Sequence, residues 1–322
     1  MNTPEGSLLS GSRVVVTGAS GFLGRHLCRR LRACGAEVHG VSRGDRQTDG
    51  HVFRWWKVDL EREQDVRDFW LALKPDLVYH LSGEINGAPT LALLLPTFRS
   101  LVTTSVNLLA VSIETATRLI LVGSLEEPAW VDAGLTPTSP YAAAKAAVTM
   151  YARMCHELFG SHVVILRTFM VYGPGQPAWK LIPSSMRDLC AGVAPRLSSG
   201  RRELDWVYVD DAIDAFVAAA ASPGVDGTTL DVGSGRLTSI RSVVEHLRRL
   251  IDPSVELHFG VVPDRPERPA RVADVGTTRD RLGWTPRIPL EDGLRTTVES
   301  FRESWSRCSD EHPSSMSESS PQ

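Results

Sequence analysis

The sequence has little of what marks secreted, membrane-spanning or metal-binding proteins. Its five cysteines are odd in number and form no Cys-x-x-Cys pair, so neither a disulfide framework nor a thiolate metal site is predicted. The nine histidines form no His-x-x-x-His pair, and no metal is expected. No apolar run reaches the roughly 18 residues that span a bilayer, and the first residues lack the regions of a signal peptide. These absences predict a cytoplasmic protein that contacts no membrane.

Positive charge is also too sparse for a nucleic-acid-binding surface. The formal net charge is -3, and no run of Lys and Arg is dense enough to form a local basic patch. We therefore expect no nucleic-acid partner. A hydrophobic content of 42% over 322 residues is ordinary for a globular chain, and the length suits two domains or one domain with an elaboration.

One glycine-rich stretch determines how the rest of the chain is interpreted. Residues 13–17 are rich in β-branched side chains and predict a buried strand, and glycines follow at positions 18, 21 and 24. Leucines at i, i+4 and i+8 then predict an amphipathic helix. A glycine turn between a strand and a helix favours a dinucleotide phosphate site, although an ordinary tight turn remains the alternative. The residues expected to hold the phosphates are Gly18, Ser20, Gly21, Phe22, Leu23 and Gly24.

The cofactor preference is read from the end of the second predicted strand, residues 36–41. An acidic residue there selects NAD, whereas an Arg accommodates the 2′-phosphate of NADP. The residues are Ser42 and Arg43, so NADP(H) is predicted with NAD as the alternative; a solvated surface Arg is the simpler interpretation of Arg43. The remaining cofactor contacts are expected from Asp59, Leu60 and Leu81, which follow the third and fourth predicted strands.

Short apolar strands alternate with helices up to residue 167, which predicts an α/β fold: a Rossmann-type, doubly wound parallel sheet with a smaller C-terminal substrate-binding region. The helix at residues 90–117 is expected to break at Pro96. The predicted organisation is a flexible N-terminus (1–10), an NAD(P)-binding domain (11–167) with returning elements near 210–232, a substrate-binding region (168–306) and a disordered tail (307–322).

A candidate catalytic group follows the fifth predicted strand. Tyr141 and Lys145 lie one turn apart on a helix that Ser139 caps, so they share a face. A neighbouring ammonium favours the phenolate, which predicts a lowered pKa for Tyr141 and a role as proton donor or acceptor at a carbonyl or alcohol. Ser124 ends the fifth strand and is the third candidate, because its hydroxyl can hydrogen-bond the same substrate oxygen.

These motifs, together with Tyr172-Gly-Pro-Gly175 and Arg281-Leu-Gly-Trp-Thr-Pro286, resemble the extended short-chain dehydrogenase/reductase family, which includes NAD-dependent epimerases and dehydratases. The resemblance implies that Ser124, Tyr141 and Lys145 are catalytic, with Tyr141 as acid/base and Lys145 also holding the nicotinamide ribose. It further implies a nucleotide-diphosphate sugar as substrate, with hydride exchanged at a sugar carbon, usually C4.

Within this family, reduction, epimerisation and dehydration compete. Sugar 4,6-dehydratases typically place Asp and Glu directly after the catalytic Ser or Thr; here the residues are Leu125 and Glu126, which disfavours dehydration. The stretch 122–127 is similar to that of GDP-4-keto-6-deoxymannose reductases, which use NADPH. The sequence thus predicts an NADP(H)-dependent reductase of a 4-keto deoxysugar nucleotide. The alternatives are an epimerase, or less readily a dehydratase, that retains NAD.

Three departures from the family pattern concern the substrate. Met170 and Leu204 stand where many relatives carry Asn and Arg that contact the sugar nucleotide, and Leu101 stands where many carry the Asn of a proton relay. They motivate a minor alternative, a non-catalytic NADP-binding sensor. The family also suggests a homodimer formed through the helices at 90–117 and 140–159. The candidate substrate-binding residues are Glu84, Glu126, Met170, Lys180, Arg201, Arg202 and Arg265.

Overall fold

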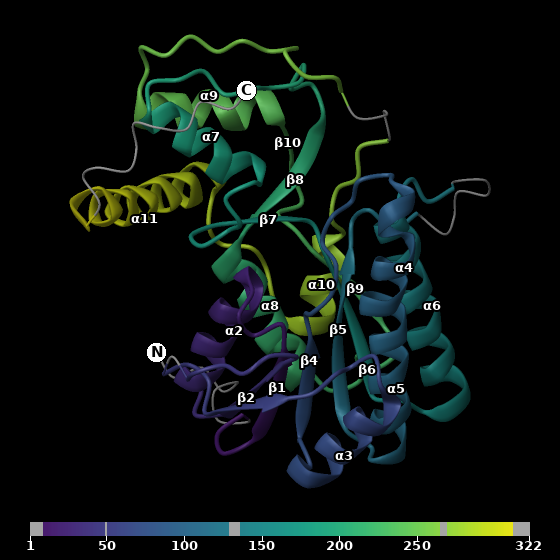
Figure 1. Ribbon diagram of the computed structural model, residues 1–322. Helices are drawn as coiled ribbons and strands as arrows, with labels where there is room; N and C mark the ends of the chain where they lie inside the picture. The colour runs from purple at the N-terminus through teal and green to yellow at the C-terminus, as the bar shows by residue number, and fades with distance from the viewer. Residues whose placement is uncertain (1–8, 49, 129–135, 265–268, 312–322) are drawn as a thin grey trace.

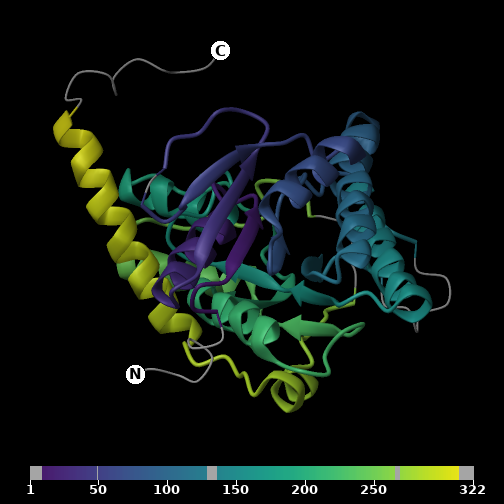
Figure 2. The same cartoon turned by 90° about the horizontal axis from the view of Figure 1, so that it is seen from below.

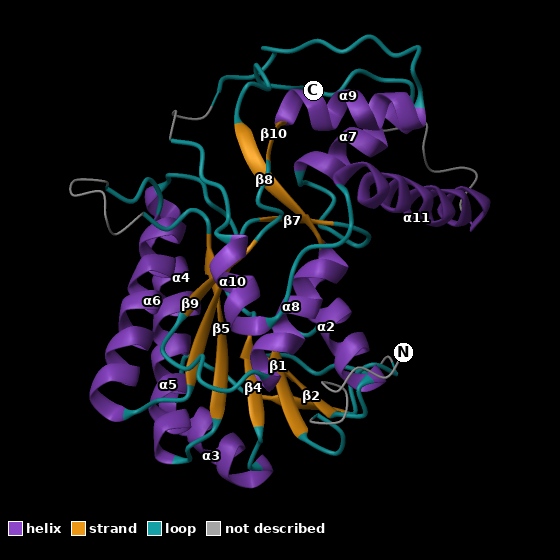
Figure 3. Cartoon of the chain, turned by 180° about the vertical axis from the view of Figure 1, so that it is seen from behind, coloured by secondary structure: helices purple, strands orange, loops and turns teal. Residues whose placement is uncertain are grey.

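The computed structural model describes residues 9–48, 50–128, 136–264 and 269–311, with side chains to residue 305. The chain forms a large parallel sheet covered by helices on both faces, with a smaller region beyond the carboxyl ends of its strands (Figures 1 and 3). The predicted α/β fold is therefore confirmed.

The large sheet has seven strands in the order β3-β2-β1-β4-β5-β6-β9, and all six neighbouring pairs are parallel. Sequence order reverses between β1 and β4, and in such sheets ligands bind in the crevice at this switch point. The strands are β1 (Arg13–Thr17), β2 (Glu37–Ser42), β3 (Arg54–Lys57), β4 (Leu77–His80), β5 (Arg118–Ser124), β6 (Val163–Thr168) and β9 (Thr229–Val232).

Both faces of the sheet are buried, which explains why its strands are continuous apolar runs. Successive side chains of a strand point to opposite faces. Val14 and Val16 accordingly join the core beneath one helical layer, while Val15 joins the core beneath the other, and all three are fully buried. The first core includes helices α2 (Phe22–Ala33) and α8 (Val209–Ala221), and the second includes α3 (Glu63–Leu73), α5 (Thr104–Glu114) and α6 (Pro140–Phe159).

The helical stretch before β5 differs from the prediction. Pro96 does not break it: η1 (Leu91–Leu93), α4 (Leu94–Thr97), the π-helix η2 (Phe98–Thr103) and α5 follow one another directly. A proline in the first turn of α4 removes only an N–H that has little to bond there, and a π-helical segment re-pairs the backbone that follows. Leu91–Glu114 is also long and apolar enough to span a bilayer, contrary to expectation, but 44% of its most apolar window is buried inside the protein.

The smaller region contains the mixed sheet β10-β8-β7, formed by β7 (Met170–Tyr172), β8 (Glu203–Tyr208) and β10 (Leu237–Ser239). Three helices pack around it: α7 (Leu181–Cys190), α9 (Ile240–Ile251) and α11 (Leu290–Glu311). Seen from below, α11 projects on the opposite side of the molecule from α4, α5 and α6 (Figure 2). The short helix α10 (Val275–Leu282) contacts β9.

The chain's last helix overlaps the tail predicted to be disordered. The backbone of α11 remains helical through residue 311, whereas the prediction ended order at residue 306. The polar composition at 307–311 does not prevent a helix that already begins at residue 290 from continuing, because extending a formed helix requires no new nucleation. Residues 1–8 and 312–322 of the two predicted flexible ends lie outside the described residues.

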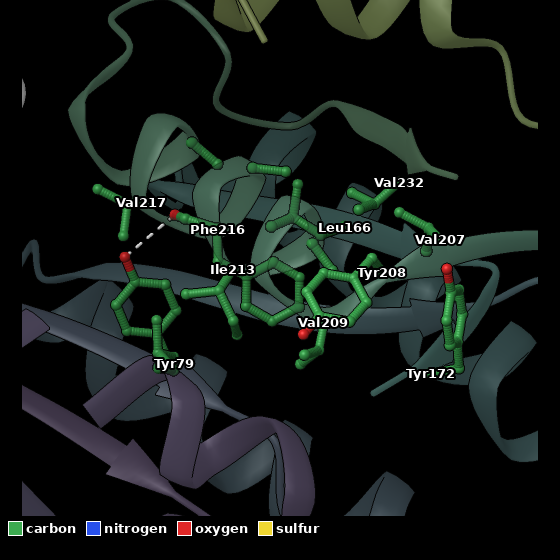
Figure 4. Packing of buried hydrophobic residues seen from close by; sticks show 14 of the residues in the cluster. Tyr79, Leu166, Tyr172, Val207, Tyr208, Val209, Ile213, Phe216, Val217 and Val232 are labelled. Atoms are coloured by element: carbon green, nitrogen blue, oxygen red, sulfur yellow. Dashed lines mark hydrogen bonds between the residues drawn. The ribbon is translucent and has the colours of Figure 1, made fainter. Parts of the chain in front are cut away.

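The two sheets share one core, and buried tyrosines join them (Figure 4). Tyr79 of β4 donates to the carbonyl of Phe216 in α8 at 3.1 Å. Tyr172 of β7 packs edge-on against Tyr208 of β8, with ring centroids 5.7 Å apart, and donates to the carbonyl of Leu290 at 3.1 Å. Buried hydroxyls are thereby satisfied, which is the condition for burying tyrosine without loss of stability.

Candidate active site

The glycine turn between β1 and α2 forms an anion cradle. Gly18 has φ = 69°, and a Cβ on Gly18 would lie 2.9 Å from the backbone nitrogen of Ser82. A Cβ on Gly24 would lie 2.1 Å from the carbonyl oxygen of Gly18. Gly21, at the N-cap of α2, supplies no side chain to the unpaired N–H groups of the first turn. Such a turn fits a pyrophosphate, and a dinucleotide is the ligand that it would hold.

The other predicted cofactor residues lie at the carboxyl ends of β2, β3 and β4. Ser42 ends β2 and Arg43 follows it, Asp59 and Leu60 follow β3, and Leu81 follows β4, so parallel pairing brings them to one edge of the sheet. Leu81 is fixed to the glycine turn, because its N–H donates to the Thr17 hydroxyl at 3.1 Å. The side chain of Arg43 is exposed.

Ser124, Tyr141 and Lys145 meet at the same edge. Ser139 caps α6 by accepting from the N–H of Ala142 at 3.1 Å, which contributes about 1 kcal/mol and sets where the helix begins. Tyr141 in the first turn hydrogen-bonds Ser124 at the end of β5. The Lys145 ammonium lies 5.9 Å from the centroid of the Tyr141 ring and donates to the carbonyl of Val122 at 2.6 Å.

The expected lowering of the Tyr141 pKa is wrong for this structure. Burial raises the pKa of Tyr141 to about 12, and the negative charges of Glu127 and Glu126 add to the rise, while the hydrogen bond with Ser124 opposes it. Burial also lowers the pKa of Lys145 to about 8. Desolvation therefore outweighs the attraction on which the prediction relied. Tyr141 is a protonated phenol near neutral pH, ready to donate.

A buried histidine stands below this group. His80, the last residue of β4, is hydrogen-bonded to the Thr17 hydroxyl at 2.8 Å and to the Thr104 hydroxyl at 3.2 Å. Burial, with a smaller contribution from the Lys145 charge, lowers the pKa of His80 to about 3. The imidazole is therefore neutral and holds β1, β4 and α5 together under the cofactor edge.

The substrate-side candidates are brought together only in part. Glu126 accepts from Arg202 at 3.2 Å, which links the turn after β5 to the start of β8. Leu204 is buried, and Met170 packs against the same core, so neither offers a polar contact to a ligand. Glu84 instead accepts from the N–H groups of residues 85 and 86 in its own loop. Lys180 is the N-cap of α7, Arg201 is exposed before β8, and Arg265 lies outside the described residues.

Sequence reasoning missed three polar residues around this site, of which Glu127 and Asp205 are buried and Arg271 is half-buried. Glu127 hydrogen-bonds the backbone of Ser124, and Arg271 donates to the carbonyls of Leu125 and Glu127. Asp205 accepts from the N–H groups of residues 234, 235 and 273, which orders the loop after β9. The two adjacent carboxylates at 126 and 127 were the available signal, but nothing local distinguished the buried Glu127 from the half-buried Glu126.

Neither a surface groove on α9 nor any cluster of metal-binding side chains gives a second candidate site among the described residues. An open groove of about 440 Å³ lies on α9, between Arg241, Arg248 and Phe259, and contains none of the predicted site residues. Its arginines already bond within the fold: Arg241 stacks on Phe259, and Arg248 donates to the carbonyl of Pro253. Among the described residues, no group of three or more His, Cys, Asp or Glu is arranged to hold a metal ion.

Comparison with known proteins agrees with this geometry. The chain is 29% identical over 333 residues to a UDP-glucose 4-epimerase of Mycolicibacterium smegmatis, covering 90% of this chain and 98% of that protein. It is 29% identical over 320 residues to a dTDP-glucose 4,6-dehydratase of Streptomyces niveus, covering 90% and 93%.

Solved structures share the fold. MoeE5 in complex with UDP-glucuronic acid and NAD has a TM-score of 0.80 at 26% identity, over 91% of this chain and 99% of that one. The UDP-glucose 4-epimerase of Thermotoga maritima, solved with UDP-glucose, also has a TM-score of 0.80, at 24% identity over 91% and 99%. The sequence profile of the NAD-dependent epimerase/dehydratase family matches residues 14–233, more than half of the chain. This protein is a member of the NAD-dependent epimerase/dehydratase family.

Proposed function

We propose that the protein is an NAD-dependent epimerase that inverts a hydroxyl-bearing carbon, at C4, of a nucleotide-diphosphate sugar. The observation that carries the proposal is the meeting of Ser124, Tyr141 and Lys145 beside the glycine turn, with an apolar Leu125 directly after Ser124. The epimerase and dehydratase relatives both span most of this chain, so the choice between them rests on the residues after Ser124.

NAD, when bound, supplies the group that takes up and returns hydride. The turn from Gly18 to Gly24 would hold its pyrophosphate, and Lys145 its nicotinamide ribose. Tyr141 exchanges a proton with the reacting oxygen of the sugar, and Ser124 hydrogen-bonds the same oxygen. Tyr141, whose pKa is about 12 in this structure, would lose its proton more readily beside the positive charge that oxidised NAD would supply.

Dehydration is disfavoured by the residues after Ser124. Loss of a hydroxyl as water needs an acid that protonates it, and Leu125 has no proton to give. Glu126 lies next in the chain, and its carboxylate accepts a hydrogen bond from Arg202 at 3.2 Å.

The diphosphate of the substrate is assigned to the basic residues at the entrance of the smaller region. Arg201 and Arg202 precede β8, and Lys180 begins α7. Alternate residues of an extended chain share a face, so Arg202 lies one repeat from Leu204, the position at which relatives of this family carry Arg. We propose that Arg202 takes over the phosphate contact by exchanging Glu126 for the ligand.

A second candidate is NADP(H)-linked reduction of a 4-keto sugar nucleotide. The specific observation in its favour is Arg43, which stands exposed at the end of β2 where an acidic residue would select NAD. The two candidates differ in the cofactor and in its fate, since a reductase releases oxidised cofactor after each turnover and an epimerase retains it.

The deciding experiment identifies the dinucleotide in the purified protein and then its substrate. Heat denaturation followed by mass spectrometry is expected to release about one NAD per chain, and the protein is expected to interconvert UDP-glucose and UDP-galactose, or the corresponding uronic acids. NADPH consumption with a 4-keto sugar nucleotide, and no retained NAD, would establish the reductase instead. No turnover with any of these substrates would contradict both candidates.

Tyr141→Phe serves as the control variant. We expect it to retain NAD and to lose at least about a thousandfold in kcat, because the acid/base is gone. A Tyr141→Phe protein with unchanged kcat would remove Tyr141 from the reaction. A wild type that binds the dinucleotide but turns over nothing would support the sensor, the minor alternative from the sequence.

We further propose that the protein is a homodimer. Large apolar side chains lie exposed on the adjacent helical stretches η1–η2 and α6, which contact each other. A second copy would bury both sets on the same surface. They include Leu91, Leu95 and Phe98 on the first stretch and Met150, Met154 and Leu158 on the second.

A further inference from the structure

Glu127 is a buried carboxylate directly behind the candidate catalytic group. It follows β5, and only 1% of its surface is exposed. One carboxylate oxygen accepts from the N–H of Ser124 at 2.6 Å, and the other accepts from the hydroxyl of Thr149 at 2.9 Å. The second oxygen also lies 3.8 Å from Nε of Arg167. The side chain therefore ties the end of β5 to both α6 and β6.

Hydrogen-bond donors and cations surround Glu127, and they oppose the desolvation that raises its pKa overall. The groups at its oxygens are donors, and cations stand on two sides: Lys145 on α6 and Arg167 on β6. Arg167 in turn donates to Asp231 of β9 at 3.0 Å. Positive and negative groups thus alternate from Lys145 through Glu127 and Arg167 to Asp231. Burial raises the pKa of Glu127, but the hydrogen bond from Ser124 and the charges of Arg167 and Lys145 oppose the rise.

The backbone around Glu127 is shaped to admit this side chain. A Cβ on Gly123 would lie 2.7 Å from the carboxylate oxygen of Glu127, so glycine at 123 leaves the room that the carboxylate fills. Arg271, from the smaller region, donates to the carbonyls of Leu125 and Glu127 and holds the turn from its other side. The turn that carries Ser124 is thereby fixed from below and from the substrate side.

We propose that Glu127 is a positioning residue of the reaction: it places Ser124 through the backbone and keeps Lys145 cationic beside Tyr141, without touching the substrate. The inference rests on the proposed function, since it assigns Glu127 to the support of the same three residues. It differs from a purely structural role because the charge, and not only the shape, of the side chain matters.

The direction of the electrostatic effect gives a specific signature. The negative charge of Glu127 raises the pKa of Lys145 and also raises the pKa of Tyr141. Glu126 adds to the effect on Tyr141, and His80, which faces Lys145 from β4, is neutral. Neutralising Glu127 therefore lowers both pKa values. Both limbs of the pH profile, the one set by Tyr141 and the one set by Lys145, therefore move to lower pH.

The test compares the pH profile of kcat for the wild type and for Glu127→Gln, each with its retained dinucleotide and a sugar nucleotide that the wild type turns over. Gln keeps an oxygen that can accept from the Ser124 N–H but has no charge. We expect kcat at pH 7.5 to fall about tenfold, KM to stay within about twofold, and both limbs to move down by about one pH unit. Unmoved limbs would overturn the proposal, even if the melting temperature fell.

Glu127→Asp is the matched variant, and it decides alone if Glu127→Gln does not fold. Asp keeps the charge but withdraws the carboxylate from Ser124 by one methylene. We expect about a fivefold fall in kcat with both limbs unmoved, and a kcat equal to that of the wild type would overturn the proposal. Failure of the proposed function is distinguishable, because the wild type itself would then show no turnover.

Discussion

Gly24→Ala tests whether the close contact between α2 and the glycine turn builds the cofactor cradle. The new methyl would lie 2.1 Å from the carbonyl oxygen of Gly18 and 2.7 Å from Cα of Ala19, against 3.4 Å or more for an ordinary contact. Both obstacles are backbone atoms, which cannot rotate away. The start of α2 must therefore move off the turn by about 1 Å.

The free-energy cost of this movement is high because the obstructing atoms belong to the backbone. Overpacking typically costs 1–3 kcal/mol, and we expect about 3 kcal/mol here because no side chain can give way. For a chain of 322 residues, that lowers Tm by roughly 4 °C. The N–H groups of the first turn are displaced from the pyrophosphate at the same time, and loss of one charged hydrogen bond weakens NAD binding by at least about tenfold.

Thermal denaturation and equilibrium binding of NAD to the emptied protein measure the two effects. Gly276→Ala is the control, because a Cβ there makes an ordinary 3.4 Å contact and the residue lies within α10; we expect unchanged NAD binding and the same or slightly higher Tm. A Gly24→Ala protein with the Tm and NAD affinity of the wild type would refute the assignment of this turn as the cradle.

Three further predictions concern stability and assembly. Unfolded His80 titrates near 6.5 and folded His80 near 3, so the unfolded chain binds more protons between these values, and stability falls on acidification by up to about 1.4 kcal/mol per pH unit. Urea unfolding at pH 5 and pH 7 should show a smaller loss for His80→Gln; equal losses would contradict this. Asp205→Asn places an amide NH2 among N–H donors and should lower the free energy of unfolding by about 3 kcal/mol. The same change at the exposed Asp280 should lower it by less than about 0.5 kcal/mol. Equal losses of stability would argue against the role of Asp205. Leu95→Asp should convert the dimer to a monomer in sedimentation velocity, while Leu71→Asp, an equally exposed position on α3, should not; a dimeric Leu95→Asp protein would exclude this surface.

Much of the fold was predictable because its signals are local. A strand buried on both faces must be a short apolar run, and β4, β5 and β6 are such runs bounded by turns or polar residues. The glycine spacing, the Ser139 cap and the Tyr141–Lys145 spacing likewise depend on residues close together in the chain. The seven-stranded order then follows from few topological choices.

The parts that sequence reasoning missed depend on burial and on distant partners. The pKa of Tyr141 is set by desolvation and by carboxylates whose positions the spacing does not reveal. Glu126 and Glu127 are adjacent and chemically identical, yet the half-buried Glu126 pairs with Arg202, whereas Glu127 is buried and accepts from the N–H of Ser124. Proline usually ends a helix, so a break was predicted at Pro96, but the helical segments continue through this residue without interruption.

The return of the chain to the main sheet has a practical consequence. The last strand of that sheet, β9, and the helix α8 that covers one of its faces are both encoded after the smaller region has begun at β7. A fragment that stops at residue 167 would leave the edge of β6 unpaired. It would also lack α8, against which Tyr79 and its neighbours pack. The large sheet is therefore incomplete in a fragment of residues 1–167, because its last strand is made only after β7, α7 and β8 of the smaller region.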